Sequence, residues 1–352
     1  MMRCLRIVFL AFVASAASER GDAQTWDITA LRSFSGLTPD QWKAVEGGEI
    51  EARVLDTERK NEVAVAGAAR LRASAACFVE RFQDIESFKK NAAVLRIEKF
   101  SPPPSPLDLA HFALEPRDLA DLESCRVGDC KLKLSAEIIE RLGRDVDWSR
   151  ADAAMRAQSV IRDELWRYLE AYIRAGDSAL MVYHDKEKPV PMASEFQPVL
   201  DARPGLAGLA PDFHEYLARY PHDALPGVRD FFYWSVETFG LKPVASITQV
   251  SMYVQPGQAL TASKQLYASH YFDASLGMSA ALDDPSDASE PHMYLVYLNR
   301  SRVDLLSGFF GGLRRAIMRG RLRDGMQKNL AEVVHRLESA CGQYPAVNSA
   351  VP

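Results

Sequence analysis

The sequence predicts an α+β protein in which a curved antiparallel sheet grips one long C-terminal helix, with a helical insertion in the middle of the chain. Three observations predict it. Strand-type alternation fills residues 45–100 and returns after residue 226, the stretch 101–225 between them has a helical pattern, and a long amphipathic helix follows the last strand. We therefore place one domain at 45–340, interrupted by the insertion 101–225, with a tail at 341–352.

Composition and charge narrow the class of protein. The chain has 352 residues, of which 47% are hydrophobic and 25% charged, as in an ordinary soluble globular protein. It carries 42 Lys and Arg against 47 Asp and Glu, a net charge of −5. Proteins that bind nucleic acid are normally basic, so we expect no nucleic-acid partner.

The N-terminus has the pattern of a secretory signal peptide. Arg3 and Arg6 precede an apolar run over 7–18, which is shorter than the ~20 residues that a membrane span needs. Small residues follow, as they do before a signal cleavage site. We predict a signal peptide over 1–24 and an exported protein, periplasmic or secreted. The alternative is a buried N-terminal helix.

The cysteines fit an oxidising compartment. Removal of the signal takes Cys4 and leaves four cysteines. Cys125 and Cys130 bracket a four-residue turn, so we predict a disulfide between them. A zinc site is disfavoured because no second close pair of ligands completes four. Cys77 and Cys341 either pair or remain buried free thiols.

The segment 45–100 is predicted to contain, in order, two strands, a helix and a third strand. Alternating hydrophobicity over 48–56 and 62–72 predicts two strands joined by the polar hairpin loop 57–61. A helix follows over 74–88, with a serine in the N-cap position. The run 93–100 is the third strand candidate.

Prolines open the helical insertion. The segment 101–106 contains four prolines, which remove backbone donors and favour an extended chain. A capping box at 149–152 opens a long helix that Gly176 ends. Shorter helical pieces follow, such as 212–220.

Strand patterns return in the last third of the chain, at 231–234, 245–254, 265–282 and 293–298. Between the last two, the acidic segment 283–290 lacks the spacing of a calcium loop and is interpreted as a solvated turn.

The run Leu266–Leu282 alternates almost without interruption. Its even-numbered side chains are apolar except for His270, so the pattern predicts one long strand with a buried even face. We expect this face to look toward the C-terminal helix and to line an apolar pocket. His270 is interpreted either as a neutral core imidazole or as a polar anchor inside a ligand cavity. The seven histidines are scattered, so no metal cluster is predicted.

The C-terminal helix, expected over Leu313–Glu338, has two kinds of side chain in one angular sector. Its second half carries an apolar stripe that includes Met326, and its first half carries arginines. The segment 300–328 holds eight Lys and Arg against two Asp. This basic face either is solvated or contacts an anionic head group or membrane surface. The run Leu305–Leu313 before it is a candidate apolar lip.

Two stretches carry a resemblance to a known superfamily. They are the strand that begins Glu62-Val-Ala-Val-Ala-Gly and feeds the helix containing Phe78-Val-Glu-Arg-Phe, and the strand at Met293–Arg300 followed by the C-terminal helix. Their order resembles a START-like (helix-grip) domain, the superfamily of lipid-transfer proteins and polyketide cyclases. The resemblance covers about 45–100 and 226–340 and implies a hydrophobic ligand held between sheet and helix. The insertion departs from compact members.

We therefore expect an exported soluble protein that binds a hydrophobic small molecule or lipid, with possible peripheral membrane contact and without a cofactor. The residues expected to bind that ligand are His270, Phe272, Leu276, Met278, Arg315, Arg319, Arg323 and Met326. Two alternatives stay open. One is a cyclase- or hydrolase-type enzyme that uses His270 with a Tyr or Asp neighbour. The other is an envelope scaffold whose segment 107–225 docks a partner.

Overall fold

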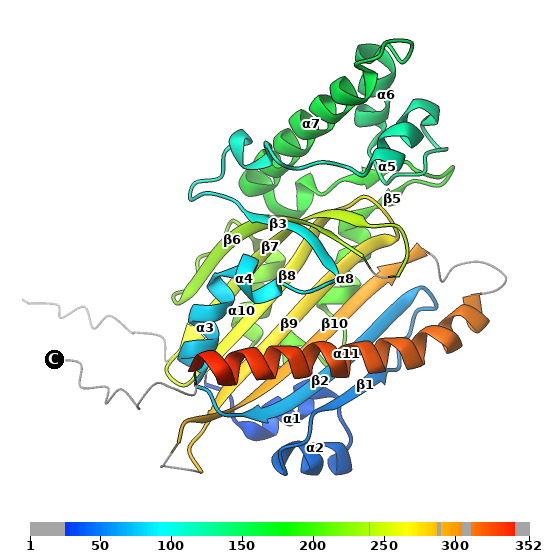
Figure 1. The fold of residues 1–352 in the computed structure, drawn as a ribbon. Coiled ribbons are helices and arrows are strands. Elements are labelled where there is room, and N and C mark those ends of the chain that lie inside the picture. The colour runs from blue at the N-terminus through cyan, green and yellow to red at the C-terminus, as the bar shows by residue number, and fades with distance from the viewer. Residues whose placement is uncertain (1–24, 239, 287–289, 305–310, 342–352) are drawn as a thin grey trace, which may run out of the picture.

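The structure, a computed structural model, describes residues 25–238, 240–286, 290–304 and 311–341, with the side chains of the last segment described from residue 319 onward. An antiparallel sheet has helices on both faces, and a helical insertion stands at one end of it (Figure 1). The predicted α+β class, large antiparallel sheet and C-terminal helix are confirmed. None of the helices in these segments is both long and apolar enough to cross a membrane.

In the segments that the structure describes, the main sheet has eight strands, and every neighbouring pair is antiparallel. In spatial order these strands are β1 (Glu51–Leu55), β2 (Glu62–Leu71), β10 (His292–Val303), β9 (Phe272–Asp284), β8 (Gln258–Ala268), β7 (Val244–Gln255), β6 (Val228–Glu237) and β3 (Val94–Lys99). The predicted hairpin around 57–61 joins β1 to β2. The two strands at the sheet's edges, β1 and β3, therefore both come from the first section of the chain.

One face of the sheet, called here the back face, is apolar. The helices that pack on it are α1 (Ile28–Ser35), α2 (Pro39–Glu46), α8 (Met192–Leu200), α9 (Leu206–Leu209) and α10 (Pro211–Arg219). Small and branched residues of the sheet, such as Ala66, Ala262 and Leu298, meet these helices in one buried cluster. The last three helices belong to the insertion, which thus supplies much of the cover of this face.

The opposite face, called the α11 face, carries α3 (Ala75–Gln83), α4 (Ile85–Lys89) and α11 (Gly311–Cys341) (Figure 1). α11 packs against β1, β2 and α3. It approaches β2 closely at Gly67, where a β-carbon would stand 3.1 Å from Leu330 and 3.2 Å from Met326. A disulfide between Cys77 of α3 and Cys341 ties down the C-terminal end of α11.

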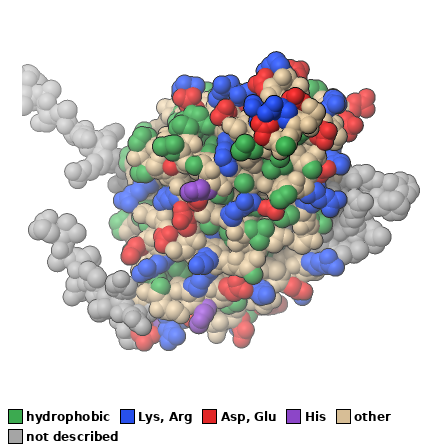
Figure 2. All heavy atoms as spheres, turned by 45° about the horizontal axis from the view of Figure 1, so that its top comes forward, with side chains coloured by type: hydrophobic (Ala, Val, Ile, Leu, Met, Phe, Trp, Pro, Cys, Tyr) green, Lys and Arg blue, Asp and Glu red, His purple; other side chains and the backbone are tan. Residues whose placement is uncertain are grey.

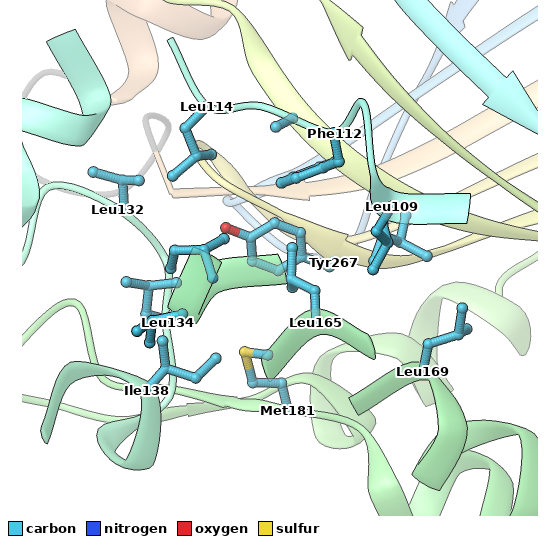
Figure 3. Close-up of a cluster of buried hydrophobic side chains, with 14 of the residues drawn as sticks. Leu109, Phe112, Leu114, Leu132, Leu134, Ile138, Leu165, Leu169, Met181 and Tyr267 are labelled. Carbon is cyan, nitrogen blue, oxygen red and sulfur yellow. The ribbon is translucent and has the colours of Figure 1, made fainter. Parts of the chain in front are cut away.

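The rest of the insertion forms its own core at the end of the sheet. It contains η1 (Pro106–Leu109), α5 (Pro116–Asp121), η2 (Leu122–Ser124), α6 (Ala136–Asp145), α7 (Ala153–Ala175), η3 (Gly176–Ala179) and a small ribbon of β4 (Val182–Tyr183) and β5 (Val190–Pro191). Tyr267 of β8 enters this core between Phe112 and Leu165, which joins the insertion to the sheet (Figure 3). The predicted Cys125–Cys130 disulfide is present here.

The prediction of one strand over Leu266–Leu282 is wrong. β8 ends at Ala268 and β9 begins at Phe272, so the run is two arms of a hairpin with His270 in the turn. Tyr271 has φ +64°, which a tight turn requires and a strand excludes. The alternation survives across a turn of three residues, so periodicity alone did not reveal the break.

The predicted orientation of the even-numbered side chains is also wrong. Leu276 and Met278 pack on the back face, in the cluster formed with α8 and α10, and not toward α11. Leu330 and Leu337 of α11 instead meet odd-numbered residues such as Ala69 and Ala281. The reason is that helices of the insertion cover the apolar face, which the sequence pattern left without a partner.

Candidate functional site

A patch of mostly polar residues lies on the α11 face, where a two-sided core would place apolar side chains. We call it the polar strip. It consists of Thr261 and Ser263 on β8, Ser275, Gly277 and Ser279 on β9, and Tyr297, Asn299 and Ser301 on β10. Residues in register on neighbouring strands share a face. Gly67, which faces α11, is in register with Tyr297, so the strip faces the same side as α11.

The strip begins where the apolar packing against α3 and α11 ends, and its Thr261, Ser279 and Ser301 are buried. Toward the Cys77–Cys341 disulfide, the same face carries apolar residues such as Leu295 and Ala281, packed with α3 and α11. Two residues away from these apolar positions, in the direction away from the disulfide, the side chains of each strand become polar. Ser263, Ser275 and Asn299 are half-buried, which leaves their polar atoms within reach of solvent or of a ligand.

The strip has spare hydrogen-bonding capacity. Ser275 and Ser301 bond through their hydroxyls at 2.8 Å, and Ser301 donates to Asn299 Oδ1 at 2.9 Å. Thr261 Oγ1 is buried without a hydrogen-bond partner in the part of the chain that the structure describes. Buried hydroxyls normally have partners, so this one is a candidate for contact with water or ligand.

An ion pair stands beside the strip. Lys89 of α4 donates to Glu237 of β6 at 2.7 Å and to the hydroxyl of Tyr233 at 3.2 Å, and Ser235 also donates to Glu237 at 2.7 Å. Burial alone would raise the pKa of Glu237, but the Lys89 ammonium and the Ser235 hydroxyl outweigh it and lower that pKa. Burial works against the charge on Lys89, whose pKa Glu237 nevertheless raises. Both groups therefore stay charged at neutral pH.

His270 lies in a turn and not on the strand that was expected to carry it. It is buried in the β8–β9 turn, and its Nε2 atom lies 2.9 Å from the carboxylate of Asp118 in α5. Asp118 also accepts from Lys242 at 3.2 Å. The alternative of a cyclase- or hydrolase-type enzyme requires a Tyr or Asp neighbour of His270, and Asp118 is such a neighbour. With 5% of His270 and 3% of Asp118 exposed, however, the pair holds the insertion to the hairpin and offers a substrate no access.

A second buried cluster at the same turn was not predicted. The Lys133 ammonium of the insertion lies 2.7 Å from Asp273, 3.2 Å from Asp304 and 3.7 Å from Asp185. Lys186 adds a second ammonium, 2.7 Å from Asp304 and 3.9 Å from Asp185, so two cations neutralise carboxylates of the kind that would also suit a metal ion. No group of three His, Cys, Asp or Glu is placed to hold a metal within the described segments. The cluster spans insertion and sheet, so its role is to dock them.

The other predicted ligand residues are dispersed. Phe272 is half-buried and, like Tyr271 and Leu322 of α11, packs against Val63 and Val303, and Met326 lies against Gly67. Arg319 pairs with Asp56 at 3.0 Å and Arg323 with Asp324 at 3.2 Å, both on the surface. The side chain of Arg315, the segment 305–310 of the expected lip and the signal 1–24 lie outside the described residues.

The residues that sequence reasoning missed are those of the strip and of the Lys89 pair. A signal existed in the odd-numbered residues of β9, which are Ser275, Gly277 and Ser279. Alternation alone places them opposite the even-numbered face, and only strand order brings Ser263 and Asn299 beside them. No family model matches the chain, and no curated protein matches it at a significant level.

Proposed function

We propose that this protein is an exported binder of a lipid-like, amphiphilic small molecule, and that the ligand lies on the polar strip beside α11. The observation that carries the proposal is the strip itself. Serine and threonine hydroxyls on neighbouring strands stand on this face in positions equivalent to those that Leu and Met side chains fill on the back face, so this part of the sheet presents polar groups where an apolar core would be expected. Their hydroxyls can bond the polar group of a ligand.

Apolar side chains border the strip on two sides. Met326 and Leu330 of α11 flank it beyond Gly67, and the half-buried Tyr271, Phe272 and Leu322 lie at the end near the insertion. An alkyl chain placed along the strip would lose water against these groups, at ~25 cal/mol per Å² of apolar area buried. Sites for small molecules commonly combine such apolar walls with a few placed polar groups.

The proposal takes up the START-like resemblance in a corrected form. In that superfamily a curved sheet holds its ligand between itself and the C-terminal helix. We propose the same grip for the α11 face, with the odd-numbered residues of β9, and not the even-numbered ones, as the floor of the site. The two disulfides support export, because disulfides persist in oxidising compartments.

The first test asks whether the protein carries a ligand. The exported protein is purified without detergent and measured by native mass spectrometry, and its organic extract is analysed for lipids. Binding of a dansyl-labelled undecanoic acid is then titrated by fluorescence. We expect a recovered amphiphile or saturable binding of the probe. A protein that carries nothing and does not bind the probe would show that the strip is a solvated sheet face.

The second test locates the site. Ser263 is half-buried on the strip and makes no side-chain hydrogen bond to any residue that the structure describes, so Ser263→Leu replaces the hydroxyl with a bulky apolar group at little cost to the fold. We expect this variant to weaken probe binding at least tenfold. Ser33→Leu, on the exposed side of α1, is the matched control and should bind as the wild type does. Unchanged binding in Ser263→Leu would place the probe elsewhere on the protein.

A further inference from the structure

A pocket of about 250 Å³ opens on the surface of the insertion, away from the polar strip. It is lined by Pro106 of η1 and by Arg162, Asp163, Trp166 and Arg167 of α7. The elements η1 and α7 are in contact, so the pocket lies where they meet. Figure 2 brings this end of the molecule forward, and hydrophobic side chains lie there among Lys and Arg.

The pocket holds a guanidinium in a fixed position. Arg162 and Trp166 are one helical turn apart and share a side of α7. Arg162 donates through Nε to the backbone oxygen of Phe112 at 2.7 Å, which orients its guanidinium. The two terminal nitrogens of Arg162 make no hydrogen bond or ion pair within the described segments. The group is half-buried, so it is positioned and partly desolvated before any ligand arrives.

The remaining lining residues define the shape of a ligand. The Trp166 indole is half-buried, and Pro106 provides a second apolar surface in the same pocket. Arg167 contributes a second cation, held loosely at 3.3 Å from Glu164. Asp163, the one acid that lines the pocket, lies 3.3 Å from Arg141. Leu107, which follows Pro106 in the chain, has 81% of its surface exposed.

We infer that this pocket binds a carboxylate carried on a ring, with the ring against the Trp166 indole and the carboxylate on the Arg162 guanidinium. A guanidinium matches a carboxylate through two parallel hydrogen bonds, and an indole offers a large flat face to a ring. An aromatic acid and a sugar acid share this chemistry. The site lies on the insertion and does not depend on the ligand proposed for the strip.

The test follows the indole N–H signal of Trp166 by NMR in the ¹⁵N-labelled full-length mature protein, assigned by its loss in Trp166→Phe. Benzoate and glucuronate are titrated separately, with benzamide as the uncharged analogue of benzoate. We expect one of the two carboxylates to shift this signal saturably, and benzamide to bind at least tenfold more weakly than benzoate if benzoate is the one. A response to glucuronate alone assigns the site to sugar acids.

Two variants complete the test. Arg162→Gln removes the positioned cation and should weaken binding at least tenfold. Arg156→Gln removes an exposed arginine of the same helix, paired with Asp152 at 2.9 Å, and should leave binding unchanged. The inference is overturned if neither carboxylate shifts the Trp166 signal, if benzamide binds as well as benzoate, or if Arg162→Gln binds as the wild type does.

Discussion

The hydroxyl of Tyr297 lies over Gly277 of the neighbouring strand, so closely that a β-carbon at position 277 would stand 2.9 Å from it. Real β-carbons essentially never approach so near, which means that the phenol occupies the space a larger residue would need. The pair also lies in the middle of the polar strip, where Asn299 is in register with Gly277. The Tyr297 side chain can therefore take this position only because residue 277 is a glycine.

We predict that Gly277→Ala destabilises the protein by about 1–3 kcal/mol, because overpacking forces Tyr297 from its position. Urea denaturation measures the change in the free energy of unfolding. Gly143→Ala is the control, since Gly143 lies exposed in α6 with nothing near its missing β-carbon. It should stabilise the protein by up to about 1 kcal/mol, because alanine is the better helix former. Equal effects of the two variants would refute the crowding at Gly277.

The two disulfides should contribute very differently to stability. Cys77 and Cys341 are 264 residues apart, whereas Cys125 and Cys130 are 5 apart. Loop-closure entropy predicts roughly 5 kcal/mol for the long loop and roughly 2 kcal/mol for the short one. We expect Cys77→Ala/Cys341→Ala to lower the melting temperature much more than Cys125→Ala/Cys130→Ala. Differential scanning calorimetry measures the melting temperatures of the two double variants. A larger drop in Cys125→Ala/Cys130→Ala would contradict the entropic argument.

Replacing Lys133 of the insertion should lower the stability of the protein much more than replacing its neighbour Lys131. Lys133 is buried beside Asp273, Asp304 and Asp185, and Lys186 also pairs with the last two, so Lys133→Met chiefly leaves the buried Asp273 carboxylate uncompensated and should cost about 3–5 kcal/mol at neutral pH. Lys131, exposed and paired with Asp121, is the control, and Lys131→Met should cost about 1 kcal/mol or less.

The pH dependence of the Lys133→Met variant has a definite sign. Burial raises the pKa of Asp273 even with Lys133 beside it, and removing the ammonium raises it further. A carboxyl whose pKa is higher in the folded state contributes stability at low pH that is lost as the pH rises through that pKa. The stability deficit of Lys133→Met should therefore shrink when urea denaturation is repeated near pH 4. A deficit that is the same at both pH values would argue against the buried carboxylates as its cause.

The predicted signal peptide implies a position for the N-terminus of the mature chain. The apolar run and the small residues after it end before Thr25, so we expect a mature N-terminus between Ala17 and Thr25. Edman sequencing or intact-mass measurement of the protein expressed with its own N-terminus reads the position directly. A protein that still begins at Met1 after secretion or fractionation would contradict the signal peptide.

Local patterns predicted most elements, and long-range pairing decided the rest. The strands around Val54 and Val65, the proline break before Leu107 and the C-terminal helix follow from periodicity and turn chemistry. The turn at His270 could not be predicted in this way, because the alternation of apolar and polar residues continues through the three-residue hairpin connection.

The candidate site was less accessible to sequence reasoning than the fold. Lys89, Glu237 and Tyr297 come from three distant segments, and only the strand order brings them to one face. The acid beside His270 was equally hidden, since Asp118 is 152 residues away. A single sequence gives the face of each strand but not which helix covers that face.

The last prediction concerns the seating of α11. A β-carbon on Gly67 would stand 3.1 Å from Leu330 and 3.3 Å from the backbone oxygen of Glu51, so Gly67→Val must push α11 away from β2. We expect a loss of about 1–3 kcal/mol of stability and, on the proposed function, weaker binding of the dansyl probe. Leu330→Ala alone opens a cavity and should cost about 2–5 kcal/mol.

Combining Gly67→Val with Leu330→Ala separates crowding from a general weakness of β2. The valine can then occupy the space that the leucine leaves, so the double variant should be more stable than the sum of the single effects predicts. Urea denaturation of all four proteins gives the coupling free energy. Strict additivity would mean that α11 and β2 do not meet at Gly67 and Leu330, and the grip of the sheet on α11 would lose its principal contact.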